Sequence, residues 1–168
     1  VRIVLEEGTG EPDAGDGGER PRLLAMHREA AAWFSRMLLR KGCGEPARDY
    51  LRARGLNREV AVRWGLGYAP DSKSDGAAQG GLCAHLQSLG YKPAELVASG
   101  LAGRSESSNR LYDRFRGRMM IPIHNDYGEV IAFSGRILDP EASPAKYVNS
   151  PETPIFTKGR VLFGLHRT

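Results

Sequence analysis

Side chains that suit phosphate and sugar oxygens gather in one stretch near the end of the chain, KYVNSPETPIFTKGR, residues 146–160. Its two prolines exclude a single helix or a central strand. Lys146 and Lys158 offer point charges to phosphate, and Asn149 can reach a sugar or a base edge. The stretch therefore predicts a binding segment for an anionic ligand.

Arginines alternate with other residues shortly before this stretch, in RLYDRFRGR. Residues two apart share a face of an extended chain, so Arg114, Arg116 and Arg118 should point one way and Phe115 the other. Their spacing of about 7 Å resembles the phosphate spacing of an extended single strand. In the alternative interpretation, one arginine pairs with Asp113 and the others are only solvated.

A further arginine, Arg136, follows Gly135 in FSGR, where the missing side chain lets another group come close to the backbone. Single cations mean little, but their density from Arg110 to Arg160 is unusual. Together with Lys146, Asn149 and the alternating arginines, Arg136 indicates contact with single-stranded nucleic acid.

Charge is distributed unevenly along the chain. The net charge is +4, yet the first 20 residues carry six acidic side chains against Arg2 and Arg20, a net of −4. The remaining 148 residues therefore carry +8. A basic body behind an acidic, glycine-rich leader favours an anionic partner, although a merely soluble basic surface has the same balance.

The sequence offers little for catalysis or metal binding. It has no G-x-S-x-G elbow, no Walker lysine loop, and no metal-ligand spacing among its four histidines. Cys43 and Cys83 are too far apart for a zinc ribbon and suit a reducing compartment. No apolar run reaches the roughly 18 residues that span a bilayer. We expect no catalytic residue, metal or membrane contact in this chain, and a cytoplasmic location.

Short helices are predicted for the first half. Residues 1–20 form an acidic, glycine-rich linker, after which Pro21 opens an amphipathic helix that Gly42 ends. Further helices are predicted over 45–54, 57–64, 82–90 and 93–100, with a glycine-rich loop over 71–81. In the second helix, Tyr50 and Leu51 should point inward.

The hydrophobic period changes after residue 100. Apolar runs flank the turn-forming NDYG and predict a β-hairpin over 118–123 and 129–137, with short strands at 147–148 and 161–165. Helices followed by a small, mainly antiparallel sheet predict an α+β fold. We expect one compact subdomain over residues 21–168.

Three separate stretches resemble bacterial DnaG-type DNA primases, in that family's order. They are RGLNREVAVRWGLGYAP, DRFRGRMMIPIHNDYGEVIAFSGRIL and KYVNSPETPIFTKGRVLFGL. The likeness extends from about residue 22 to residue 168 and implies the N-terminal subdomain of the RNA polymerase core. Ser134 stands where the family usually has glycine, and Thr157 where it commonly has histidine, which weakens any role for Thr157.

The resemblance also implies what the parent protein does. DNA primases are nucleotidyltransferases, DNA-directed RNA polymerases that make RNA primers for replication in the primosome. The chain lacks an initiator Met and is expected to be a piece of such a parent. A zinc domain would precede it, a Toprim subdomain with Mg²⁺ or Mn²⁺ would begin just after residue 168, and a C-terminal domain would bind the replicative helicase. This chain alone should be inactive; it would guide the single-stranded DNA template to the Toprim metals, where the RNA primer grows from ribonucleoside triphosphates.

The implied DNA-binding residues are carried over position by position: Arg54, Arg114, Arg116, Arg136, Lys146, Asn149 and Lys158. Only Arg54 could not be found from side-chain chemistry alone. Two alternatives stay open at this point. One is a stand-alone module that binds single-stranded nucleic acid without catalysis, and the other is an unrelated basic interaction domain.

Overall fold

The computed structural model describes residues 18–71 and 80–161. Almost all of the predicted acidic linker, most of the glycine-rich loop and residues 162–165 of the predicted last strand lie outside this part. Its helices are α1 (Glu19–Leu39), α2 (Glu45–Ala53), α3 (Arg58–Trp64), α5 (Gly81–Ser88) and α6 (Pro93–Ala98). Its strands are β1 (Gly67–Ala69), β2 (Ala102–Arg104), β3 (Leu111–Asp113), β4 (Arg118–His124), β5 (Val130–Ile137) and β6 (Tyr147–Asn149).

The helices follow from local sequence signals. The stripe predicted for α1 is buried, including Met26, Ala30 and Phe34, although α1 begins before Pro21, at Glu19. Asn57 caps α3, because its side chain accepts a hydrogen bond of 2.9 Å from the Val60 main-chain N–H. Short amphipathic helices of this kind depend on tertiary packing for their stability.

Four strands form one antiparallel sheet in the order β1-β4-β5-β6. The predicted hairpin is β4–β5, closed by NDYG, where Asn125 accepts main-chain hydrogen bonds from Tyr127 and Glu129. The strand β6 ends at Asn149, one residue beyond the prediction, and Val161 is not in a strand. A separate two-stranded sheet, β2-β3, was not predicted.

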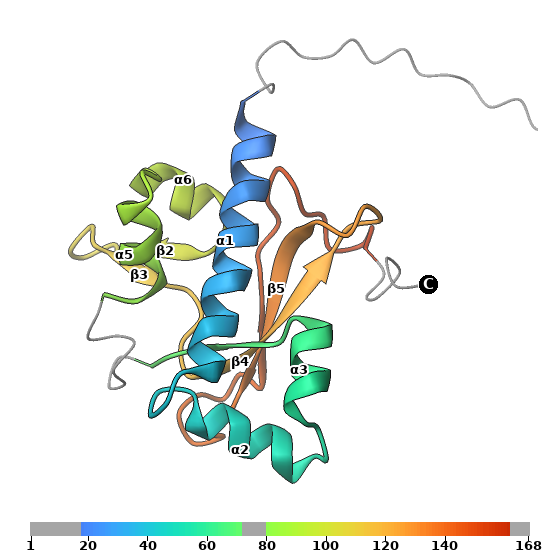
Figure 1. Cartoon of the computed structure of the whole chain (residues 1–168). Coiled ribbons are helices and arrows are strands. Elements are labelled where there is room, and N and C mark those ends of the chain that lie inside the picture. The colour runs from blue at the N-terminus through green and yellow to red at the C-terminus, as the bar shows by residue number, and fades with distance from the viewer. Residues whose placement is uncertain (1–17, 72–79, 162–168) are drawn as a thin grey trace, which may run out of the picture.

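The long helix α1 runs across the sheet, with α5, α6 and β2-β3 on one side and α2 near its C-terminal end (Figure 1). Aromatic rings fill the space between helix and sheet, since the ring centroid of Phe34 lies 5.2 Å from that of Phe133 and 6.5 Å from that of Phe115. Gly67 of β1 lies so close that a Cβ atom there would come within 2.5 Å of Phe34 Cβ. The α+β prediction, helices first and antiparallel strands second, is confirmed.

No helix in the described part of the chain is both long and apolar enough to cross a membrane.

One ionisable side chain is fully enclosed in this core. His27 of α1 is 0% exposed, its Nδ1 donates to the main-chain oxygen of Leu23 at 2.8 Å, and its ring stacks on Phe133. Burial lowers the pKa of His27, and main-chain hydrogen bonds at Leu23 and Ser99 oppose this only in part. The folded state therefore favours the neutral imidazole.

We expect this histidine to make the fold sensitive to acid. The contribution of neutral His27 to the free energy of unfolding is fully present above the pKa of histidine in the unfolded chain, about 6.5. It is lost as the pH falls below that value, because the unfolded chain binds the proton more readily, by up to about 1.4 kcal/mol per pH unit. Urea unfolding between about pH 7.5 and 5 should show a smaller loss of stability for His27→Leu than for the unchanged protein. Equal pH dependence of the two proteins would contradict this assignment.

Candidate nucleic-acid interface

A cleft of about 530 Å³ lies between the end of α2, the end of β5 and the loop that leads to β6. It brings together three of the predicted cations, Arg54, Arg136 and Lys146, with the ring of Tyr50. We call it the Tyr50 cleft. Its floor includes Ile137, so it combines charge with apolar surface, as clefts that accept nucleic-acid bases and phosphates do.

Two tyrosines hold the guanidinium groups of this cleft. The guanidinium carbon of Arg54 lies 3.6 Å from the centroid of the Tyr50 ring. That of Arg136 lies 5.8 Å from the Tyr50 ring and 5.1 Å from the Tyr147 ring, and its Nη1 donates to the Tyr147 hydroxyl at 3.0 Å. Cation–π contacts of this kind fix the direction of a long side chain without neutralising its charge.

Local structure explains why these residues meet. Tyr50 and Arg54 are four residues apart at the end of α2 and therefore lie on one side of the helix. Arg136 of β5 pairs in register with Tyr147 of β6, and paired residues point to the same face of a sheet. The hydrogen bond to Tyr147 is the main reason why the pKa of Arg136 lies above its ordinary value. Arg136 is thus a permanent cation.

A second cleft, of about 580 Å³, adjoins the first. Its lining includes Arg114 and Arg116, and we call it the Arg116 cleft. Arg114 Nη2 donates to the main-chain oxygen of Asn149 at 3.3 Å. The guanidinium carbon of Arg116 lies 5.7 Å from the centroid of the exposed Tyr112 ring, which is outside the lining of this cleft.

The two clefts lie on either side of one chain segment. Both are lined by Ile137, Leu138 and Ser143, so the segment from the end of β5 into the following loop separates them. The cations therefore form two adjoining groups rather than one flat row.

Arg118 lines the Arg116 cleft together with Arg114 and Arg116, but it is buried, and the predicted row of arginines along one extended strand is wrong. Strand β3 ends at Asp113, and Gly117 adopts a positive φ of 61°, so the chain turns before β4 begins. Arg118 is 5% exposed, and burial lowers its pKa.

The buried guanidinium of Arg118 has main-chain and side-chain partners. Its Nη1 donates to the oxygens of Gly135 at 3.1 Å and Lys146 at 3.5 Å, and its Nη2 donates to Ser143 Oγ at 3.4 Å. A Cβ atom at Gly135 would lie 3.0 Å from Arg118 Cδ, so the glycine makes room for the arginine. The expected close approach at Gly135 is thus present, and its partner is Arg118.

Asn149 and Lys158 are placed less centrally. Asn149 lies in β6 opposite Ser134, is exposed, and touches Arg114 through its main-chain oxygen. Lys158 is exposed in the turn that follows the bridge between Thr153 and Phe156, and it lines neither cleft. Lys158 therefore belongs to neither group of predicted cations that the clefts bring together.

Sequence reasoning missed the tyrosines. Tyr50 was expected to point inward, and it is partly buried against the core, but its ring also contacts Arg54 and Arg136, which was not predicted. The spacing of four residues between Tyr50 and Arg54 on a helix was the available signal. Tyr147 is 50% exposed, and only the register of β6 on β5 reveals its contact with Arg136.

Within residues 18–71 and 80–161, no three histidine, cysteine, aspartate or glutamate side chains lie together in a way that could hold a metal ion.

Comparison with known proteins shows the family to which this chain belongs. The family described as "DNA primase catalytic core, N-terminal domain" matches residues 33–168. The chain belongs to this family. The DNA primase of Legionella pneumophila is 38% identical over 159 residues, which cover 93% of this chain and 25% of that protein. The chain thus spans about a quarter of the length of the curated primases that it matches.

Solved primase structures share the fold. The RNA polymerase domain of Mycobacterium tuberculosis primase DnaG, in complex with double-stranded DNA, is 38% identical with a TM-score of 0.76, covering 88% of this chain and 44% of that one. A DnaG primase catalytic domain bound to single-stranded DNA is 35% identical with a TM-score of 0.72, covering 88% and 43%. The Aquifex aeolicus primase structure, which contains zinc-binding and RNA polymerase domains, is 28% identical with a TM-score of 0.73, covering 93% and 36%.

The roles of Arg116 and Arg118 can be separated by stability measurements. Arg118→Leu should lower the free energy of unfolding by about 2 kcal/mol, because buried carbonyl oxygens lose their donor. Arg116→Leu, the matched change at an exposed position, should alter it by no more than about 0.5 kcal/mol. Urea unfolding followed by circular dichroism measures both. Equal losses of unfolding free energy would mean that the buried Arg118 stabilises the fold no more than the exposed Arg116.

Proposed function

We propose that this chain is the N-terminal part of the RNA polymerase core of a bacterial DNA primase, and that it binds the single-stranded DNA template. The observation that carries the proposal is the pair of adjoining cationic clefts, each of which sets guanidinium groups beside tyrosine rings. Primase domains of the same family bound to single-stranded and double-stranded DNA support it.

The chemistry of the clefts suits a single strand better than a closed duplex. Arginine and lysine side chains attract backbone phosphates whatever the sequence. Tyr50, Tyr147 and Tyr112 offer ring faces on which unpaired bases can stack, at about 1–3 kcal/mol per base. We propose that the strand runs from one cleft to the other over the segment that both share, and that Asn149 contributes at its edge.

We propose that the template leaves this surface toward a Toprim subdomain that lies beyond residue 168 of the parent protein. There Mg²⁺ or Mn²⁺ would stabilise the attacking and leaving oxygens as ribonucleotides are joined to the RNA primer. The zinc-binding domain of the Aquifex relative supports zinc in the parent as well. Under this proposal residues 1–20 connect such a domain to the subdomain over 21–168. The fragment alone would bind DNA but would not polymerise.

Further partners follow from membership of the family. The parent would use ribonucleoside triphosphates and would reach the replicative helicase through a separate C-terminal domain, in the bacterial cytoplasm. The alternative of a stand-alone binding module without catalysis is not favoured, because the chain spans only about a quarter of the DNA primases that it matches. The chain in its parent should therefore be required for primer synthesis.

The template proposal predicts a specific change in salt dependence. The change Arg136→Ala should weaken binding of a fluorescein-labelled oligothymidylate about tenfold and lower the slope of log affinity against log salt concentration by about one unit. Arg104→Ala, an exposed arginine of β2, is the matched control and should leave both quantities unchanged. Fluorescence anisotropy over a sodium chloride series measures both, and circular dichroism confirms that the variants fold.

An unchanged salt slope in folded Arg136→Ala would contradict a phosphate contact at the Tyr50 cleft. Loss of the fold would assign Arg136 to structure instead. Equal effects of Arg136→Ala and Arg104→Ala would show that only overall charge matters, and would favour an unspecific basic surface over a template track.

A further inference from the structure

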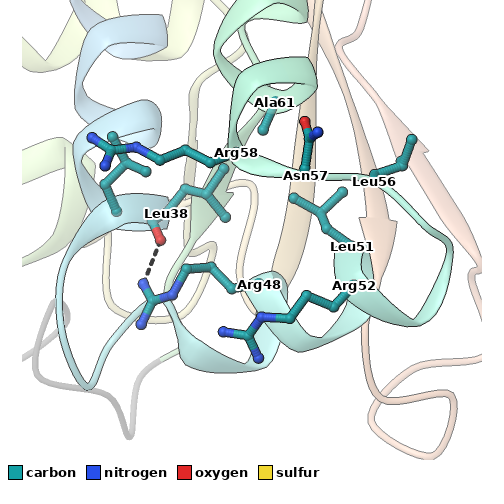
Figure 2. A pocket seen from close by; sticks show the side chains of 9 residues that line it. Leu38, Arg48, Leu51, Arg52, Leu56, Asn57, Arg58 and Ala61 are labelled. Carbon is teal, nitrogen blue, oxygen red and sulfur yellow. Dashed lines mark hydrogen bonds between the residues drawn. The ribbon is translucent and has the colours of Figure 1, made fainter.

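A small apolar recess of about 190 Å³ lies where α1, α2 and α3 meet. Leu38 of α1, Leu51 of α2 and Ala61 of α3 contribute to its walls (Figure 2). Leu39 of α1 also lines it. Leu39 is 41% exposed, although leucine is usually covered when it lies beside other apolar side chains. The recess shares no lining residue with the Tyr50 cleft or the Arg116 cleft.

Arginines surround this recess. Figure 2 shows Arg58 extending from α3 toward α1, while Arg48 and Arg52 lie along α2. Arg48 is held in place, because its Nη1 donates to the main-chain oxygens of Leu38 at 2.6 Å and Arg40 at 2.9 Å. Arg52 pairs with Asp49 at the surface, and Arg58 is exposed.

The surrounding segment is strongly basic. Residues 36–64 contain eight arginines or lysines and three acidic residues, a net charge of +5. This is more than the net charge of +4 of the whole chain. The lining itself contains three arginines and no acidic residue, so apolar surface and negative charge in a ligand would both match the recess.

The walls of the recess argue against a nucleotide as the occupant. The side chains that form its apolar surface are aliphatic, whereas the Tyr50 cleft contains a tyrosine ring on which a base can stack. Its volume suits one bulky apolar side chain inserted as an anchor, the arrangement that dominates binding energy in many protein interfaces. Carboxylates beside that anchor could pair with Arg52 and Arg58, which would favour encounter and orientation.

We propose that this recess, which we name the Leu39 recess, docks an acidic peptide segment of a partner protein, with one bulky apolar side chain inserted between α1, α2 and α3. The recess is built from residues other than those that line the cationic clefts, although α2 contributes to the recess and to the Tyr50 cleft. A replication protein that docks there would contact the chain through residues that line neither cationic cleft.

The test uses the fluorescein-labelled peptide DDELFEDD as the probe, with the 168-residue chain titrated against it in fluorescence anisotropy. We expect saturable binding at least tenfold tighter than that of DDESSEDD, which lacks the apolar anchor, and of KKKLFKKK, which reverses the charge. The change Leu39→Gln should weaken binding of DDELFEDD about tenfold. Its matched control, Leu89→Gln, alters an exposed leucine outside the recess and should have no effect.

The charge requirement is tested separately. The double change Arg52→Glu and Arg58→Glu should abolish binding of DDELFEDD while leaving oligothymidylate affinity within about threefold of normal. Arg28→Glu, an exposed arginine of α1 outside the recess, is the control for charge reversal. Equal affinity for DDELFEDD and DDESSEDD, or no effect of Leu39→Gln, would overturn the proposal. An oligothymidylate affinity that falls as steeply as peptide binding in the double variant would assign the recess to nucleic acid and also overturn it.

Discussion

The buried guanidinium of Arg118 is the interaction on which both cationic clefts depend. It binds the main chain at Gly135 and Lys146 and the hydroxyl of Ser143, so it connects β5 to the loop that precedes β6. This loop separates the Tyr50 cleft from the Arg116 cleft and contributes Ser143 to both. A Cβ atom at residue 135 would crowd both Arg118 and Phe115, each at 3.0 Å, so glycine there eases the packing of Arg118. The sequence pattern groups Arg118 with ligand-binding arginines, yet its guanidinium is buried. Its hydrogen bonds fix the position of the segment that separates the two clefts.

Tyrosine rings then determine where the exposed cations point. Long arginine side chains lose conformational entropy when they bind, and a ring that already restrains them lowers that cost. Tyr50 contacts both Arg54 and Arg136, and Tyr147 contacts Arg136 by its ring and by its hydroxyl. The same rings could receive unpaired bases. Charge and stacking surface are therefore supplied together, by α2 on one side and by the β5–β6 pair on the other.

Sequence patterns predicted the features that depend on local signals. The helix α3, the β4–β5 hairpin around NDYG, and the order of helices before strands all follow from residues close together in the chain. The failures need long-range information. The burial of Arg118, the β2–β3 sheet and the contact between Tyr50 and Arg136 depend on which segments pack together, and local periodicity does not specify that. The family resemblance supplied Arg54, yet only the structure shows that Arg54 stacks on Tyr50.

The most direct test of the central claim, that the two clefts act as one surface for a single strand, is nuclear magnetic resonance mapping of amide shifts during titration with an oligothymidylate of about ten nucleotides. Amides of Arg54, Arg136 and Lys146 should shift at the same oligonucleotide concentration as that of Arg116. A five-nucleotide oligomer should shift the two groups less strongly and no longer in parallel. Shifts confined to one cleft with the longer oligomer would contradict a continuous track.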